Sequence, residues 1–297
     1  MTAPAWAWVV FTLVAATAQT FRNAAQRSLT ETLGTAGATH VRFLFGLPFG
    51  LLMLAVVAVV AGPLPMPGAA TLAWTVFGAL SQIVATGLML AAMRERSFVV
   101  TTAYTKTEPI QVALFAVVFL GEHLTPVLIA AILTATAGVL ALSWPQRSGD
   151  EIFSWRPAAL GIISGGLFAL AAVAFRGGIG TLDAPYIPAA TTTLALSLAV
   201  QSVLLSAWLW FREPEVLRGV LRAWRPSLPA GFLGAFASEM WFLAFAIQSP
   251  SRVRTLGLVE IVIAGIVSRR LFTQKLSLRD LAGMALVIVG IGLLFDS

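Results

Sequence analysis

The sequence is poor in the residue types on which most enzymes and secreted proteins depend. It contains no cysteine, which excludes disulfide bonds, thiolate metal sites and cysteine nucleophiles. Only two histidines are present, His40 and His123, and neither has a partner motif for catalysis nearby. Charged residues make up 11% of the chain, against about 25% in a typical soluble domain. These shortages argue against a water-soluble fold.

The sequence is rich in apolar residues: 58% of the 297 residues are hydrophobic, and the mean hydropathy is +0.89. A membrane-spanning helix needs about 20 mostly apolar residues. The chain offers ten such segments, and the connections between them are short and rich in turn-forming residues. The first segment lacks the positive flank of a cleaved signal peptide, so we expect it to be retained. The predicted spans cover residues 5–26, 34–61, 69–93, 98–120, 125–144, 157–179, 186–211, 228–248, 253–271 and 278–295.

The basic residues predict the orientation in the membrane. Thirteen of the 19 lysines and arginines fall in connections after odd-numbered spans, whereas those after even-numbered spans hold only Arg252 and Arg254. Cytoplasmic loops are enriched in lysine and arginine. The odd connections are therefore predicted to lie in the cytoplasm, and both termini outside the cell (inner or plasma) membrane. The net charge of +6 does not indicate nucleic-acid binding, because the basic residues are scattered singly.

The two halves of the chain resemble each other. An offset of 152 residues aligns Glu108 with Glu260 without a gap from about residue 78 to 145. Each half has five spans, an odd number, so the second copy must cross the membrane in the opposite direction. We therefore expect an all-α integral membrane protein with ten transmembrane helices in two inverted five-helix repeats, residues 1–148 and 149–297. Further coincident pairs are Ser97 with Ser249, Leu124 with Leu276, Thr125 with Ser277, Gly138 with Gly290 and Leu142 with Leu294.

The fourth predicted span is unusual because Lys106, Glu108 and Pro109 lie in its middle. A charge at bilayer depth costs about 2.5–3.5 kcal/mol by insertion assays, so it indicates function. Pro109 has no N–H, which frees the carbonyl of Thr105, and it biases Glu108 away from helical geometry. A broken helix with ionisable residues at mid-depth is typical of a transporter site.

The pattern of Glu108–Pro109, then residues 121–125 (Gly-Glu-His-Leu-Thr), then Gly138–Val139 resembles the repeat of EamA-type transporters of the drug/metabolite transporter superfamily. The layout of five plus five spans extends this resemblance over the whole chain. In the second copy Ile261 replaces the proline and Gln274 the second glutamate, which suggests that the halves are not equivalent. The resemblance implies export or exchange of small metabolites such as amino acids, nucleosides or sugars. Family members are often drawn with both termini in the cytoplasm, opposite to the orientation that the loop charges predict.

Three acids lie within predicted spans. Glu108 and Glu260 are repeat mates, and two-fold symmetry brings both toward one axis. They either bind a substrate amine, couple transport to protons, or form structural pairs with neighbouring helices. Glu239 has Gly87 as its repeat mate, and an unmatched acid suits substrate specificity.

The other candidates are basic, polar or aromatic residues within the spans. Lys106 either pairs with an acid on another span or binds a substrate carboxylate. Polar residues of the first span recur at helical spacing, which predicts a bundle interface or a wet cavity. Arg22, Arg42 and Arg176 are candidates for gating or for ion pairs, with snorkelling to the interface as the alternative. The further substrate candidates are Gln19, Asn23, Gln82, Tyr104 and Trp241.

These features favour a secondary transporter that exports or exchanges amino acids by alternating access around a midplane cavity, since sites of both signs suit a zwitterion. A permease for a nucleoside, a sugar or a drug-like compound remains an alternative. A polytopic enzyme is less favoured because the acids occur singly and not in clusters that could bind a metal. A receptor or scaffold is less favoured because the charged residues of the midplane occur in both repeats. No P-loop is present, so an ion gradient, with protons as one option, or the substrate gradient would drive transport. The expected partners are a small-molecule substrate and the lipid bilayer, with no cofactor, metal or nucleic acid, and the chain is expected to act as a monomer.

Overall fold

The computed structural model describes residues 3–95, 101, 104–143, 155–261 and 278–296, and this part of the chain contains helices and connections but no strand. Five of its helical segments are long and apolar enough to cross a membrane, with α1 and α2 counted together. The prediction of an all-α membrane protein is confirmed. The helices are α1 (Ala7–Leu44), α2 (Leu47–Ala61), α3 (Ala69–Glu95), α5 (Glu108–Leu120), α6 (Pro126–Ser143), α7 (Trp155–Gly180), α8 (Tyr186–Arg212), α9 (Pro214–Arg222), α10 (Trp224–Ile247), α11 (Pro250–Leu256) and α13 (Leu278–Phe295).

The first predicted boundary was wrong. Helix α1 continues past residue 26 and breaks only at Gly34, whose φ of 67° and ψ of 178° favour glycine. Hydropathy marks the apolar thickness of the membrane, whereas the helix extends beyond it through polar residues such as Glu31. The second span then bends at Phe45–Gly46 before α2 begins.

The polarity of the bundle is inverted relative to a soluble protein. Large apolar side chains such as Val59, which is 86% exposed, and Leu114 point outward. Arg22, His40 and Gln201 are buried between helices. This distribution is what a lipid-facing surface around a polar interior requires.

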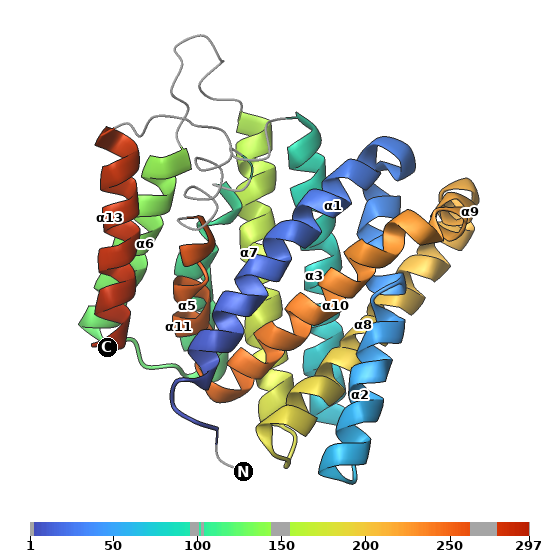
Figure 1. Ribbon diagram of the computed structural model, residues 1–297, viewed down its shortest axis with the longest axis horizontal. Helices are drawn as coiled ribbons and strands as arrows, with labels where there is room; N and C mark the ends of the chain where they lie inside the picture. The colour runs from blue at the N-terminus through green and yellow to red at the C-terminus, as the bar shows by residue number, and fades with distance from the viewer. Residues whose placement is uncertain (1–2, 96–100, 102–103, 144–154, 262–277, 297) are drawn as a thin grey trace.

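Helices pack in pairs that follow the repeat (Figure 1). Helix α1, the first span, crosses α10, the eighth, and α7, the sixth span, lies along α3, the third. These two contacts are equivalent, because the sixth span is the repeat mate of the first and the eighth is the repeat mate of the third. Helix α6 packs on its own repeat mate α13 at one edge, and α2 packs on its mate α8 at the other. Both chain ends lie at the same end of the bundle, as an even number of spans requires. The division of the repeats at residue 148 falls outside the described residues and stays a prediction.

Helices α6 and α13 approach closely through two glycines that are repeat mates. A Cβ on Gly138 would lie 2.7 Å from the carbonyl oxygen of Gly283, and one on Gly290 would lie 2.6 Å from the backbone nitrogen of Ala135. Small residues at such crossings let helix backbones approach each other in membranes. Neither position leaves room for a methyl group.

Gly138→Ala and Gly290→Ala are each expected to destabilise the protein by about 1–3 kcal/mol, because the added methyl group must push two backbones apart. The midpoint of thermal unfolding in detergent, followed by tryptophan fluorescence, measures this effect. Gly292→Ala, also on α13, is the matched control because no atom lies within 4 Å of its Cβ position. Equal midpoints for all three variants would show that the crossing is not tightly packed.

Candidate functional site

Two helices are broken at equivalent points of the two repeats. A turn at Lys106–Thr107 precedes α5, and a turn at Gly257–Leu258 follows α11. The predicted break at the first point is confirmed, whereas no break was predicted at the second, where Ile261 replaces the proline. Residues 262–271 of that span lie outside the described residues.

The second break arises without a proline. A Cβ on Gly257 would lie 2.7 Å from Cη2 of Trp241, so the backbone passes directly against the indole ring. Glu108 begins α5, and Glu260 follows the turn at Gly257 by three residues. An acid at the start of a helix is favoured because the helix dipole places partial positive charge there.

The two glutamates form crossed ion pairs between the repeats. Lys106 Nζ pairs with Glu260 Oε1, and Arg254 Nε lies 3.1 Å from Glu108 Oε1. None of the four side chains is more than 10% exposed. We call these four residues the charged quartet. Its charges compensate one another, which a buried group in a membrane protein requires. The expectation that Lys106 pairs with an acid on another span is confirmed.

Helices α1 and α10 hold the quartet in place. The guanidinium carbon of Arg254 lies 4.2 Å from the centre of the Trp241 ring, a cation–π contact. Trp241 Nε1 donates a hydrogen bond of 3.0 Å to Gln19 Oε1. Thr20 Oγ1 donates to Glu260 Oε2 at 3.4 Å. Spans from both repeats therefore meet at the quartet.

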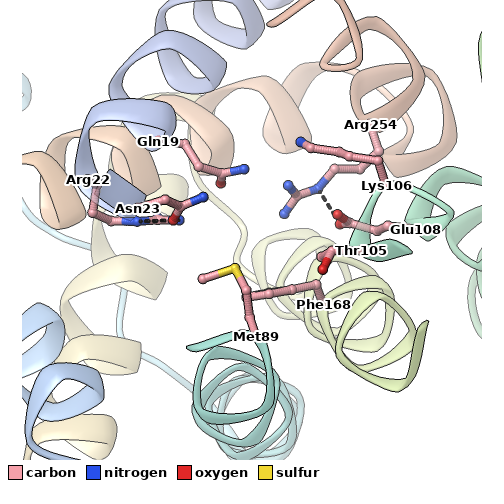
Figure 2. Close-up of a pocket in the computed structure, with 9 residues that line it drawn as sticks. All are labelled: Gln19, Arg22, Asn23, Met89, Thr105, Lys106, Glu108, Phe168 and Arg254. Carbon is pink, nitrogen blue, oxygen red and sulfur yellow. Dashed lines mark hydrogen bonds and ion pairs between the residues drawn. The ribbon is translucent and has the colours of Figure 1, made fainter. Parts of the chain in front are cut away.

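A small cavity lies between α1 and the quartet (Figure 2). Its volume is about 20 Å³, roughly the room that one water molecule needs. Polar and charged side chains of the first repeat and Arg254 of the second face it, so the two repeats meet at a polar centre. The lining residues are Gln19, Arg22, Asn23, Met89, Thr105, Lys106, Glu108, Phe168 and Arg254.

Three substrate candidates lie away from this cavity. Glu239 on α10 accepts a hydrogen bond of 2.5 Å from Thr191 on α8. Gln82 on α3 accepts one of 2.8 Å from Gln201 on the same helix α8. Tyr104 packs against Gly161 of α7, where an added Cβ would lie 2.6 Å from the tyrosine Cβ. None of the three is among the residues that line the cavity.

The arginine candidates have no carboxylate partners among the described residues. Arg176 Nη1 donates to the carbonyl oxygens of Phe245 at 2.5 Å and Ala246 at 2.9 Å, at the end of α10. Arg22 and Arg42 donate only to neutral acceptors. The ion pairs expected for these arginines are absent from the described part of the chain, and the gating role stays a prediction.

Arg254 is the site residue that the sequence did not indicate. It was counted among the charges of a connection although the predicted span 253–271 contains it, and it lies within α11 and is 9% exposed. Its position six residues before Glu260, on the same broken span, is the signal that would have indicated it. Met89 and Phe168 were also missed, because nothing distinguishes them from other apolar residues of a span.

The sequence matches the EamA-like transporter family at residues 6–144 and again at residues 155–296. The chain belongs to the EamA-like transporter family. Its two matches are the two repeats, one for each half of the chain. Members of this family are membrane transporters of the drug/metabolite type, so this EamA-like protein is a multi-pass membrane transporter.

A solved structure described as "Crystal structure of protein" shares the fold of this EamA-like transporter. The two sequences are 17% identical, and the superposition covers 96% of this chain and 95% of the other with a TM-score of 0.67. A comparison with curated proteins finds no match.

Breaking one crossed ion pair is expected to destabilise the transporter strongly. Glu260→Gln and Lys106→Met each leave one buried charge without its partner, at a cost of about 3–5 kcal/mol. The double variant removes both charges and should unfold at a higher temperature than either single variant. Thermal unfolding in detergent measures all three.

The exposed pair between Arg156 and Glu95 is the matched control for this experiment. Arg156 is 68% exposed and lies 3.4 Å from Glu95 Oε1. Arg156→Gln should change stability by less than about 1 kcal/mol. If the double variant loses as much stability as the two single variants together, the charges of Lys106 and Glu260 do not compensate each other.

Proposed function

We propose that this transporter exports or exchanges amino acids across the cell membrane by alternating access. The observation that carries the proposal is the cavity beside the charged quartet, which presents both positive and negative side chains between the two repeats. A zwitterion needs both signs of charge in one site. A nucleoside, a sugar or a neutral drug-like compound makes no use of them, so these substrates are second candidates.

The small volume of the cavity implies movement in the transport cycle. An amino acid is several times larger than a water molecule, so the space of about 20 Å³ must open on one side and then on the other. The glycine at the Gly34 break and the turns in the two broken spans are points where the backbone can change direction locally. Rocking of residues 1–148 against 149–297 around the quartet would supply the movement.

Glu108 and Glu260 are the groups we assign to coupling. Both carboxylates lie within the bundle, and each is paired with a base of the other repeat. The cavity is formed within one chain, so a monomer contains the complete site.

Counterflow in liposomes tests the proposed function. Vesicles loaded with an unlabelled amino acid should accumulate the same labelled amino acid, for at least one of the 20 standard amino acids. Glu108→Gln and Glu260→Gln should lower the initial rate at least about tenfold, because each removes the acidic partner of a buried ion pair.

Arg156→Gln, which changes only an exposed pair, should retain the full rate in the same assay. The amino-acid proposal fails if no amino acid moves while the protein remains folded. Normal counterflow rates in both glutamate variants would show that the quartet has only a structural role.

The charges at the two ends of the bundle support the proposed orientation, with both termini outside. The described connections at the end that holds both termini contain no lysine or arginine, and of the two arginines in α11 Arg254 is buried. Helix α9 and the end of α3 lie at the opposite end (Figure 1) and carry several arginines. The positive-inside rule places that opposite end in the cytoplasm.

Single cysteines test this orientation cleanly because the chain has none of its own. Met66→Cys, at a position that is 89% exposed in the connection after α2, should react with a membrane-impermeant maleimide on intact cells. Glu213→Cys, between α8 and α9, should react only after permeabilisation. The reverse pattern would place both termini in the cytoplasm.

A further inference from the structure

Two buried arginines of the first repeat have only neutral partners among the described residues. Arg22 is 1% exposed, and its Nε and Nη2 both donate to Asn23 Oδ1, at 3.2 and 2.7 Å. Arg42 is 3% exposed and donates to the hydroxyl oxygens of Thr86 at 3.1 Å and Ser238 at 3.5 Å. Within the described part of the chain, Arg22 Nη1 and Arg42 Nε have no hydrogen-bond partner.

The two arginines pass the same point of α10. A Cβ on Gly234 would lie 3.1 Å from Arg42 Cγ and 3.7 Å from Arg22 Cδ. The absence of a side chain at Gly234 therefore makes room for Arg42, and Arg22 lies beside the same position. Arg22 also lines the cavity, so the pair extends from the cavity into the interior of the bundle.

Neither arginine forms an ion pair with a described acid of the bundle, although the charge of Glu260 acts on Arg22 from a distance. Glu108 and Glu260 are paired with the two bases of the quartet. Glu239 accepts a hydrogen bond from Thr191 on α8 and lies within 4 Å of no described base. An excess of positive charge therefore remains beside the cavity.

A guanidinium group cannot remove this excess by losing its proton. Buried cations in a membrane protein pair with an anion or face water. Arginine prefers carboxylates, which can accept two parallel hydrogen bonds from its fork. In this structure the single oxygen of Asn23 receives both donors of that fork, where a carboxylate would offer two oxygens.

We infer that Arg22, supported by Arg42, binds the carboxylate of the transported molecule, and that Asn23 occupies the arginine fork when the site is empty. This assignment rests on the proposed function and names the chemical class of its substrate. A bound carboxylate displaces the Asn23 amide oxygen from Nε and Nη2 of Arg22. The substrates are then carboxylic acids, and neutral sugars and nucleosides are excluded.

The geometry also gives the bound molecule a direction. Figure 2 shows Arg22 and Asn23 on one side of the cavity, and Glu108 with Arg254 on the other. A zwitterion with its carboxylate on Arg22 directs its ammonium group toward Glu108. Gln19, which lies between them in the view, is positioned to contact the middle of the molecule.

Ligand-induced thermal stabilisation of the purified protein tests the assignment with a panel of small molecules. The ligands are the 20 standard amino acids, their carboxamides, and acetate, lactate and succinate, at constant ionic strength. We expect at least one acid to stabilise the protein and to bind at least about tenfold more tightly than its uncharged or amide counterpart, because a charged hydrogen bond is lost in the latter.

Two variants separate binding from structural support. Arg22→Lys keeps the charge but not the fork, so acid affinity should fall about tenfold. Asn23→Ala removes the competing acceptor, so acid affinity should rise even if the protein becomes less stable. A purely structural role for Arg22 would leave acid affinity unchanged in Arg22→Lys and would not raise it in Asn23→Ala.

The outcomes separate this inference from the proposed function. Stabilisation by organic acids that Arg22→Lys weakens, without counterflow of any amino acid, supports the carboxylate site and refutes amino-acid transport. Counterflow of an amino acid with equal binding of its carboxamide supports transport and overturns the carboxylate site. Stabilisation by phosphate or sulfate but by no carboxylic acid would also overturn it.

Discussion

The crossed ion pairs of the quartet are the contact around which the bundle is arranged. Lys106 and Glu108 of the first repeat are each compensated by a residue of the second, Glu260 and Arg254. Separation of the broken helices at this point would leave buried charges unpaired, at a cost of several kcal/mol. The repeats are therefore held together at their centre. The neutral hydrogen bond between Gln19 and Trp241 is a weaker contact beside it.

Duplication supplies a symmetric scaffold, and individual substitutions supply an asymmetric site. The glycine contact of α6 with α13 is reciprocal, and both repeats break at the same span. Each repeat has an arginine directly after a phenylalanine, Arg22 in the first and Arg176 in the second, and the two arginines have different contacts. Arg22 lines the cavity, whereas Arg176 donates to carbonyl oxygens at the end of α10. The first repeat thus places this arginine beside the cavity, which gives the cavity a positive side and a mixed side.

The same break in the chain arises from different chemistry in the two repeats. In the first, Pro109 lies in the first turn of α5 just after the turn at Lys106–Thr107. In the second, Gly257 permits the close approach of Trp241, and the position of the proline is taken by Ile261. What both copies keep is a glutamate just after the break. A shared geometry with a change of residue is expected where the backbone conformation, and not one side chain, is what function requires.

The sequence by itself determined the membrane class, the helical spans, the two repeats and the charged break at Lys106–Glu108, because hydropathy, period and local backbone restrictions act over short stretches of chain. It also indicated most of the residues that meet at the cavity, among them Gln19, Arg22 and Asn23. Only the tertiary structure decided which charges compensate one another: it moved Arg254 from a connection into the quartet, turned Glu239 toward α8, and left Arg22 and Arg42 without acids among the described residues. A pairing between residues more than a hundred positions apart depends on how spans pack and rotate, and no local pattern in the sequence encodes that rotation.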